Sequence, residues 1–274
     1  MSSFPFSDTD LAALARRMRD LAVEAGAAIM PHFRSAALER RDKPDGTPVT
    51  AADLAANAVI LAGLRASHPG IAAISEEEGS DVLTDPDRPF FLIDPLDGTK
   101  EFLNGSGQFT VNIALVVDRL PLLGVVYAPA IERLQWVRGP GDAVEEAPPH
   151  TADRIGALAP IRSRTADNAA LTAVLSRSHM NPETRAYVAR YAVAASSRAG
   201  SSLKFCLLAA GEADFYPRMG PTCEWDTAAA HAVLRAAGGR VAAYPQGEEL
   251  RYGKPGLRNP FFIACGDGVN LLPA

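Results

Sequence analysis

The sequence predicts an α/β or α+β protein in which helices and sheets pack in layers. Apolar residues at helical spacing alternate with short apolar strands along the 274 residues, and no internal repeat or long linker divides them. Because 47% of the residues are hydrophobic, the chain can bury a large core. We therefore expect one domain over residues 1–274, built from two closely packed halves of about 1–150 and 151–274.

Two helices are expected near the start of the chain. Residues 8–33 carry apolar side chains at helical spacing, and Ser7 with Asp10 resembles a capping box. A second helix is expected to begin at Thr50, where Asp53 has the position of a capping partner. The polar connector at 40–50 is interpreted as a loop with a plausible function.

Short strands follow the second helix. Residues 71–75 form a strand that leads into three glutamates, and the apolar residues 90–93 predict a buried strand that ends at Asp94. Strands over 108–117, 122–127 and 134–137 predict an antiparallel meander. Residues 139–153 are rich in Gly, Pro and acidic residues, and we expect a surface loop there.

The second half of the chain alternates strands with helices. Its expected helices cover 181–191, 201–213 and 224–237, and its expected strands cover 172–179, 192–197, 214–219, 240–244 and 260–265. The first of these strands is expected to end in a polar loop.

Composition excludes several classes of function. A net charge of −5 leaves no general basic patch for nucleic acid. The cysteines Cys206, Cys223 and Cys265 are isolated and odd in number, as expected in a reducing compartment. The first residues lack the features of a signal peptide, and no stretch approaches the roughly 18 apolar residues of a membrane helix. We expect a cytoplasmic protein with no transmembrane segment and no nucleic-acid partner.

Two carboxylates flank a tight bend after the strand at 90–93. Asp94 and Asp97 lie on either side of the Leu96 carbonyl, and Pro95 and Gly98 favour a turn. Carboxylate and carbonyl oxygens gathered at one point suit a hard cation such as Mg²⁺. The alternative is an Asx-type turn between strands.

Three further acids lie at the ends of predicted elements. Asp53 has the alternative role of a helix cap, Glu76 that of a solvated loop acid, and Asp226 that of a cap in the first turn of the helix after Pro221. Together with Asp94 and Asp97, and with Thr99 beside them, these acids predict a site for two or more Mg²⁺ ions. Such a site neutralises a phosphate and positions a water for in-line attack.

The motifs at these acids resemble the inositol monophosphatase superfamily of Mg²⁺-dependent, lithium-sensitive phosphatases. They are SEE at 75–77, DPLDGT at 94–99 and WDTAAAHAVLRAAGG at 225–239. Within the superfamily, the chain is most similar to the bacterial 3′(2′),5′-bisphosphate nucleotidases of the CysQ type. That similarity lies in GTPVTAAD (46–53), DPLDGTKEFLNGSGQFTVNIAL (94–115), LGVVYAPA (123–130), SRSH (176–179) and GSSLKFCLLAAGEADFYPRMGPT (200–222). The resemblance covers nearly the whole chain and implies a layered α-β-α-β-α sandwich with the site between its halves.

The resemblance implies two or three Mg²⁺ ions and their ligands. Glu76, Asp94 and the Leu96 carbonyl would hold the first ion, and Glu76 would reach a third, weaker one. Asp94, Asp97 and Asp226 would hold the second ion.

The resemblance also implies the catalytic and substrate-binding residues. Thr99 and Asp53 would orient and deprotonate the attacking water, and Gly98 and Thr99 would offer backbone amides to the phosphate. The substrate would also contact Glu76, Leu96, Asp97 and Asp226 of the metal site and, on its nucleotide side, His179, Ser201, Lys204 and Arg218. The last four keep simpler alternatives: surface charges for Lys204 and Arg218, a loop histidine for His179 and a helix N-cap for Ser201.

The implied reaction removes the 3′-phosphate of adenosine 3′,5′-bisphosphate, giving AMP and phosphate, by in-line attack of a metal-activated water. Phosphoadenosine phosphosulfate is a second candidate substrate, and the implied role is clearance of a by-product of sulfate assimilation. An inositol or sugar phosphate phosphatase on the same metals is the alternative, and a non-catalytic metal- or nucleotide-binding regulator is a minor one. A monomer and a homodimer both stay open, as does peripheral association with the inner face of the cell membrane.

Overall fold

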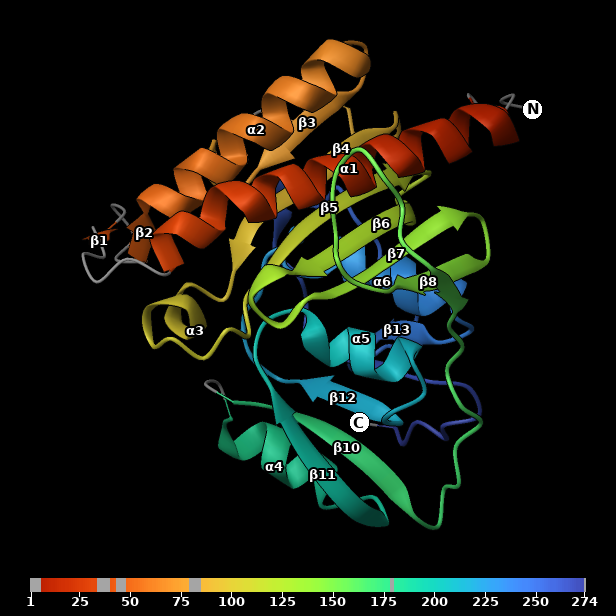
Figure 1. The fold of residues 1–274 in the computed structure, drawn as a ribbon. Helices are drawn as coiled ribbons and strands as arrows, with labels where there is room; N and C mark the ends of the chain where they lie inside the picture. Colours follow the sequence, from red (N-terminus) through yellow and green to blue (C-terminus); the bar gives the residue numbers. More distant parts are fainter. Residues whose placement is uncertain (1–5, 34–39, 43–47, 79–84, 178–179, 274) are drawn as a thin grey trace.

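The structure is a computed structural model that describes residues 6–33, 40–42, 48–78, 85–177 and 180–273. Figure 1 shows, from the top downwards, two long helices, a seven-stranded sheet, two shorter helices and a five-stranded sheet. A last helix packs on this second sheet and forms the fifth layer. The predicted α-β-α-β-α sandwich is therefore confirmed. The middle pair of helices contacts elements of both sheets, so the two halves of the chain share one interior.

The first layer consists of α1 (Asp8–Phe33) and α2 (Ala51–Ser67), which pack against each other. Both predicted capping boxes are present: the side chains of Ser7 and Asp10 bond each other's backbone amide, and Thr50 caps α2 together with Asp53. The ends of the connector are not loop as expected, because β1 (Arg40–Asp42) and β2 (Pro48–Thr50) pair antiparallel. Its residues 43–47 lie outside the described residues.

The seven-stranded sheet follows sequence order. Its members are β3 (Ala72–Ser75), β4 (Phe90–Asp97), β5 (Thr110–Val117), β6 (Leu120–Ala128), β7 (Arg133–Gly139), β8 (Asp142–Glu146) and β9 (Leu158–Pro160). Only β3 and β4 pair in parallel within it, and the rest form the predicted meander. All eight residues of β5 are buried, because α1 covers one face of the sheet and α6 (Ala228–Ala236) covers the other.

β4 does not end at Asp94 as expected. It continues to Asp97, which pairs with Thr110, and the register shifts between Asp94 and Asp97. Pro95, which cannot donate a ladder hydrogen bond, is accommodated at this irregularity. The short helix α3 (Thr99–Leu103) begins immediately after Gly98. The bend is therefore a bulged strand joined directly to a helix.

The surface loop expected at 139–153 is in part wrong, because this segment contains β8. Glu146 at the end of β8 forms a fully buried ion pair with Arg19 of α1. Burial opposes ionisation of Glu146, but the nearby His150 ring and the hydrogen bonds from Arg19 and the Gly156 amide outweigh burial and lower its pKa to about 2. Arg19 also donates to the carbonyl of Thr151. These contacts hold the chain after β8 against α1.

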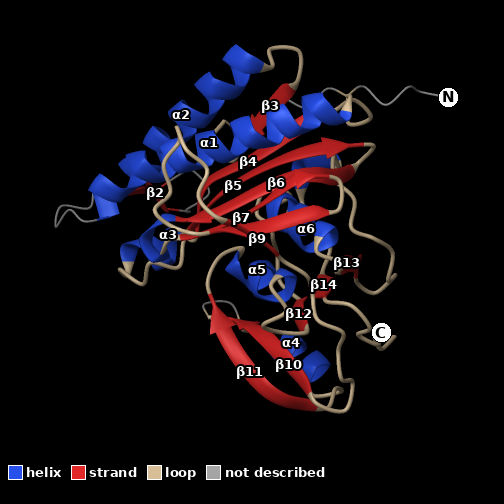
Figure 2. Ribbon diagram, turned by 45° about the vertical axis from the view of Figure 1, so that its right-hand side comes forward, coloured by secondary structure: helices blue, strands red, loops and turns tan. Residues whose placement is uncertain are grey.

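The five-stranded sheet has the order β11-β10-β12-β14-β13. Its strands are β10 (Leu171–Ser176), β11 (Val193–Ala199), β12 (Phe215–Arg218), β13 (Arg240–Ala243) and β14 (Phe262–Cys265). Figure 2 shows β10 and β11 at the lower edge of the molecule. The helices of this half are α4 (Pro182–Val188), α5 (Leu203–Ala209) and α6, and a short 3₁₀ turn, η2, covers Pro255–Leu257, as η1 covers Pro129–Ile131 in the first half.

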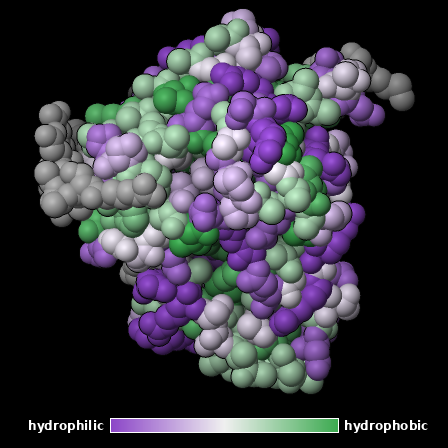
Figure 3. All heavy atoms as spheres, viewed as in Figure 1, coloured by the Kyte–Doolittle hydropathy of each residue, from purple (hydrophilic) through white to green (hydrophobic). Residues whose placement is uncertain are grey.

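The helices next to the site begin later than expected. α5 begins at Leu203, and α6 begins at Ala228, so Asp226 precedes α6 and does not lie in its first turn. None of the described helices combines the length and the apolar character needed to cross a bilayer. On the face drawn in Figure 3, hydrophilic and hydrophobic residues are interspersed.

Candidate active site

A cavity of about 300 Å³ opens between the two halves of the chain. Its walls come from β4 and α3 in the first half, and from α5, β12 and the turn before α6 in the second. The predicted site residues that line it are Glu76, Asp94, Leu96, Asp97, Gly98, Thr99, Ser201, Lys204, Arg218 and Asp226. Of the predicted residues that the structure describes, only Asp53 does not line it, and His179 lies outside the described residues.

Three carboxylates come together at one end of the cavity. Oxygens of Glu76, Asp94 and Asp226 lie within 4.8 Å of one another. Because β3 and β4 run parallel, Glu76 after β3 and Asp94 in β4 reach the same edge of the sheet. Asp226 reaches them from the turn before α6, where its carboxylate accepts the Cys223 amide at 2.8 Å.

Burial is the main cause that raises the pKa of these acids. For Asp94 the pKa lies well above its usual value, because burial is joined by repulsion from Glu76, Asp97 and Asp226. For Asp226 burial and then Asp97 raise the pKa to about 8. The folded chain thus concentrates carboxylates whose charges repel one another. A hard divalent cation with oxygen ligands would relieve that repulsion, so the residues present fit a metal centre.

Asp97 and Leu96 stand beside the three-acid group. The Leu96 amide donates to Asp94 Oδ1 at 3.1 Å, which fixes one ligand oxygen within the bulge. Asp97 Oδ2 accepts the hydroxyl of Ser201 at 2.8 Å, and burial raises its pKa although the charge of Lys204 lowers it. The structure therefore brings Asp97 to the cavity, but outside the group of oxygens within 4.8 Å.

Asp53 is a buried cap of α2. Its Oδ2 accepts both the Thr50 amide at 2.8 Å and the Thr50 hydroxyl at 2.6 Å. Burial raises its pKa, those hydrogen bonds lower it, and the charge of Glu76 raises it further, so Asp53 lies within electrostatic reach of the acid cluster. Thr99 begins α3 and lines the cavity.

The wall of the cavity formed by α5 and β12 carries two cations, Lys204 and Arg218. Lys204 is not the surface charge of the alternative interpretation, since only 6% of it is exposed. Its ammonium lies 5.2 Å from the centre of the Tyr216 ring, and burial lowers its pKa to about 8 although Asp97 opposes this. Arg218 donates to the Pro221 carbonyl at 3.1 Å, and its buried Nε has no hydrogen-bond partner among the described residues. This wall is therefore suited to a buried anion.

Ser201 is not the N-cap of α5, because Ser202 has that position. The backbone of Ser201 is left-handed, with φ 53°. Its hydroxyl contacts both the side chain and the carbonyl of Asp97. Its own carbonyl accepts the ammonium of Lys204. Ser201 thus contacts a carboxylate and a cation of the site at once.

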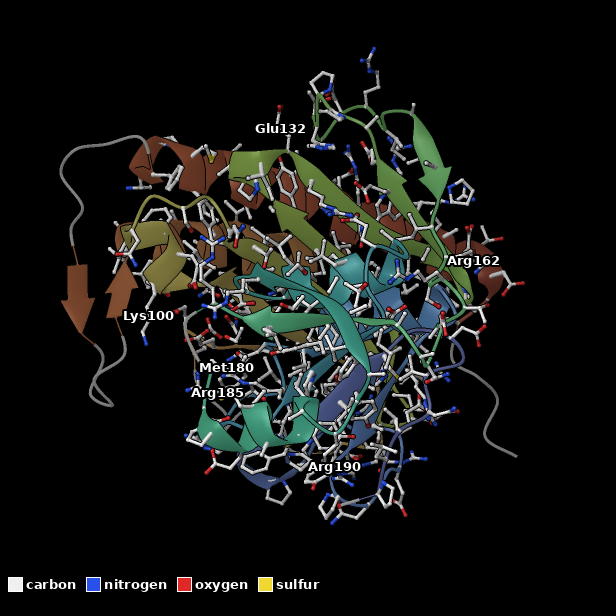
Figure 4. All side chains as sticks on the ribbon, turned by 90° about the horizontal axis from the view of Figure 1, so that it is seen from below. Lys100, Glu132, Arg162, Met180, Arg185 and Arg190 are labelled. Carbon is white, nitrogen blue, oxygen red and sulfur yellow. The ribbon has the colours of Figure 1, made fainter. Side chains whose placement is uncertain are left out.

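Some lining residues were missed by the sequence analysis. Among them are Glu101 of α3, Ser176 of β10, and Tyr216, Thr222 and Phe262 around Arg218. Side chains of a strand alternate between faces, so Tyr216 could have been found two residues before Arg218. Lys100 also lines the cavity but is exposed, and Figure 4 shows it on α3, on the same side of the molecule as Met180.

Clustered carboxylates bind divalent cations, and bound cations in turn bind phosphate. A site of this kind is therefore typical of a metal-dependent phosphatase. The chain belongs to the inositol monophosphatase family, whose family model matches residues 10–261. Two relatives, from Salmonella typhimurium and Escherichia coli K12, carry the name 3′(2′),5′-bisphosphate nucleotidase CysQ. They are 44% and 43% identical over 235 residues, which are 85% of this chain and 91% of each relative.

Solved structures give the same result. CysQ from Bacteroides thetaiotaomicron, described as a bacterial member of the inositol monophosphatase family, is 35% identical with a TM-score of 0.77. The match covers 94% of this chain and 98% of that one. An inositol monophosphatase from Zymomonas mobilis shares the fold, with a TM-score of 0.74 at 24% identity and 93% of each chain covered.

Proposed function

We propose that this enzyme removes the 3′-phosphate from adenosine 3′,5′-bisphosphate and releases AMP and phosphate. The supporting observation is that one cavity contains both an acid cluster and a cationic wall. A substrate with two separate phosphates fits this arrangement, with one phosphate held through cations at the acids and the other at Lys204 and Arg218. The name shared by the CysQ relatives agrees with this substrate.

The metal proposed for the site is Mg²⁺, with two or three ions. Glu76, Asp94, Asp97, Asp226 and the Leu96 carbonyl would hold them, since all line the cavity and offer hard oxygen ligands. When bound, the ions supply charge neutralisation at the phosphate and lower the pKa of water.

Asp53 and Thr99 are proposed as the pair that orients the attacking water. Both Asp53 hydrogen bonds to Thr50 use Oδ2, so Oδ1 is the atom that would take the proton passed on by the Thr99 hydroxyl. The raised pKa of Asp53 makes it a stronger base than an ordinary aspartate. Gly98 and Thr99 are proposed to hold the phosphate through their backbone amides, and His179 is kept as a nucleotide contact.

The test compares kcat/KM with Mg²⁺ for adenosine 3′,5′-bisphosphate, inositol 1-phosphate and fructose 1,6-bisphosphate. We expect the bisphosphate nucleotide to be preferred by about a hundredfold or more, since the cationic wall has no second phosphate to bind in inositol 1-phosphate. Equal kcat/KM values for the three substrates, or a preference for the inositol or sugar phosphate, would leave the proposed metal site standing and would refute the nucleotide pocket. Absence of turnover with all three would favour the regulatory alternative. Phosphoadenosine phosphosulfate belongs in the same series as the second candidate substrate.

We also propose a cytoplasmic location and a monomer or homodimer. The three cysteines are free thiols, which supports a reducing compartment. Cell fractionation separates a cytoplasmic protein from one bound to the inner face of the membrane, and light scattering gives the oligomeric state.

A further inference from the structure

A line of buried hydroxyl groups lies behind the cavity wall. It starts at Thr110 of β5, whose Oγ1 lies 2.5 Å from Ser201 Oγ and 2.8 Å from Ser202 Oγ. Ser202 Oγ donates to Asn112 Oδ1 at 2.7 Å, which ties the line to β5 a second time. Thr110 itself is fully buried and does not line the cavity. Its hydroxyl joins a strand of the first half to the turn that opens α5 in the second half.

The directions of these bonds single out Thr110. Ser201 donates its proton to Asp97, and Ser202 donates its proton to Asn112. Both serine oxygens therefore face Thr110 as acceptors, and the single hydroxyl proton of Thr110 is donated to one of them at a time. A valine of the same shape at position 110 would leave both oxygens facing a methyl group.

Thr110 contacts the turn that contains Ser201 and Ser202, and the backbone of this turn is unfavourable without supporting contacts. The left-handed backbone of Ser201 is unfavourable for a residue with a Cβ atom, so it persists where surrounding contacts fix it. From this conformation, the Ser201 hydroxyl holds Asp97 and the Ser201 carbonyl holds the Lys204 ammonium. The orientation of a proposed metal ligand and that of an anion-binding lysine thus depend on the same residue.

We propose that Thr110 is a positioning residue that fixes Ser201 and, through it, both Asp97 and Lys204. Thr110 couples the metal end of the cavity to its cationic wall without touching either the metal or the substrate. The choice of substrate for its test rests on the proposed function, but metal binding can be measured without any substrate.

The test compares Thr110→Val with Thr110→Ser, and uses Thr172→Val as a matched control. Thr172 accepts a hydrogen bond from Arg164 at the start of β10, away from the cavity. Mg²⁺ affinity is measured by calorimetry on the chelator-stripped protein. The values of kcat and KM are measured for adenosine 3′,5′-bisphosphate and for p-nitrophenyl phosphate.

We expect Thr110→Val to weaken Mg²⁺ binding by roughly 10- to 100-fold, as is usual when a supporting hydrogen bond behind a metal ligand is lost. Its KM for the bisphosphate should rise more than its KM for p-nitrophenyl phosphate, because Lys204 is displaced as well. Thr110→Ser should restore both quantities, since it keeps the hydroxyl and loses only a methyl group.

Two results would overturn the proposal. Thr110→Val could bind Mg²⁺ and bisphosphate as Thr172→Val does, or Thr110→Ser could be as impaired as Thr110→Val, which would assign the effect to packing. If Thr110→Val does not fold, Thr110→Ala removes the same hydroxyl and is judged by the same criteria. If the wild-type protein turns over no bisphosphate, the proposed function fails, and the Mg²⁺ titration still decides the role of Thr110.

Discussion

At Asp94, the charge that metal binding needs conflicts with the stability of the folded chain. Only 1% of Asp94 is exposed, and four other carboxylates raise its pKa in addition to burial. A carboxylate in this environment is unfavourable for the folded chain unless cations accompany it. We therefore expect the same residue to lower the stability of the metal-free protein and to be required for metal binding.

The substitution Asp94→Asn keeps the shape of the side chain and removes its charge. We expect turnover to fall by about a hundredfold or more, because a ligand shared by two proposed ions is lost. The melting temperature in excess chelator should rise, since one buried charge has gone. Activity close to that of the wild type would refute the metal site, and an unchanged melting temperature would refute the electrostatic account.

Lys204 provides a second prediction at this scale. Lys204→Ala removes a buried cation from the cationic wall of the cavity, so KM should rise more for adenosine 3′,5′-bisphosphate than for p-nitrophenyl phosphate. Lys100→Ala is the matched control, because Lys100 lines the same cavity but is exposed. Equal effects of Lys204→Ala on both substrates would argue that Lys204 does not contact the second phosphate.

The elements of the site show what the sequence can and cannot predict. Both capping boxes were predicted correctly, because each signal lies within four residues of the chain. The extension of β4 to Asp97 depends on pairing with Thr110, and the burial of Glu146 depends on Arg19, 127 residues away. Non-local partners of this kind leave no local pattern.

In the candidate site, too, features with a local sequence signal could be predicted and features that depend on non-local packing could not. The gathering of Glu76, Asp94 and Asp226 could be predicted, because the local sequence places each of them near the predicted end of a strand or start of a helix. The burial of Lys204 could not, since it arises only where α5 packs between the two sheets.

Gly98 connects the bulged strand β4 to α3. A substitution at Gly98 therefore tests whether the geometry of that junction matters. Its φ is 94°, and a Cβ atom there would lie 3.3 Å from both the Gln108 carbonyl and Ser201 Cβ. We expect Gly98→Ala to destabilise the protein by roughly 1–3 kcal/mol and to lower kcat, because Thr99 follows directly. Gly105→Ala is the control, since it has φ 68° and no atom near the added Cβ. Equal losses of stability and activity in both variants would show that the contacts around Gly98 do not matter.

At the scale of the whole molecule, the two halves share the layer of α5 and α6. α6 packs on β5 and β6 of the first sheet and also contacts β13 of the second. We therefore propose that residues 1–274 unfold as one domain, and we expect a single calorimetric transition. Two separate transitions, assignable by fluorescence of Trp136 in the first half and Trp225 in the second, would contradict this.

The acid cluster should make the metal-free protein sensitive to pH. In the folded state, burial raises the pKa of Asp226 to about 8 from the ordinary 3.8 of an unfolded chain. Between these values the folded state keeps a proton that the unfolded state releases, so the free energy of unfolding falls as the pH rises from about 4 to about 8.

The measurement is calorimetric melting with chelator or with Mg²⁺, at about pH 5.5 and about pH 8. Stabilisation by Mg²⁺ should be larger at the higher pH, because ions then bind carboxylates that have already lost their protons. In Asp226→Asn this difference should shrink. A metal-free protein that becomes more stable between these two pH values would contradict the prediction.

The buried ammonium of Lys204 has a consequence for chemical labelling. An amine whose pKa is about 8 is neutral in about a tenth of molecules at pH 7, whereas an ordinary lysine is almost entirely protonated there. A neutral amine is a nucleophile. An aldehyde or activated ester that carries a phosphate would be drawn to the cationic wall and would acylate or condense with this nitrogen ahead of ordinary lysines. We therefore expect the candidate cavity to offer a point of attachment for covalent inhibitors and reporter groups.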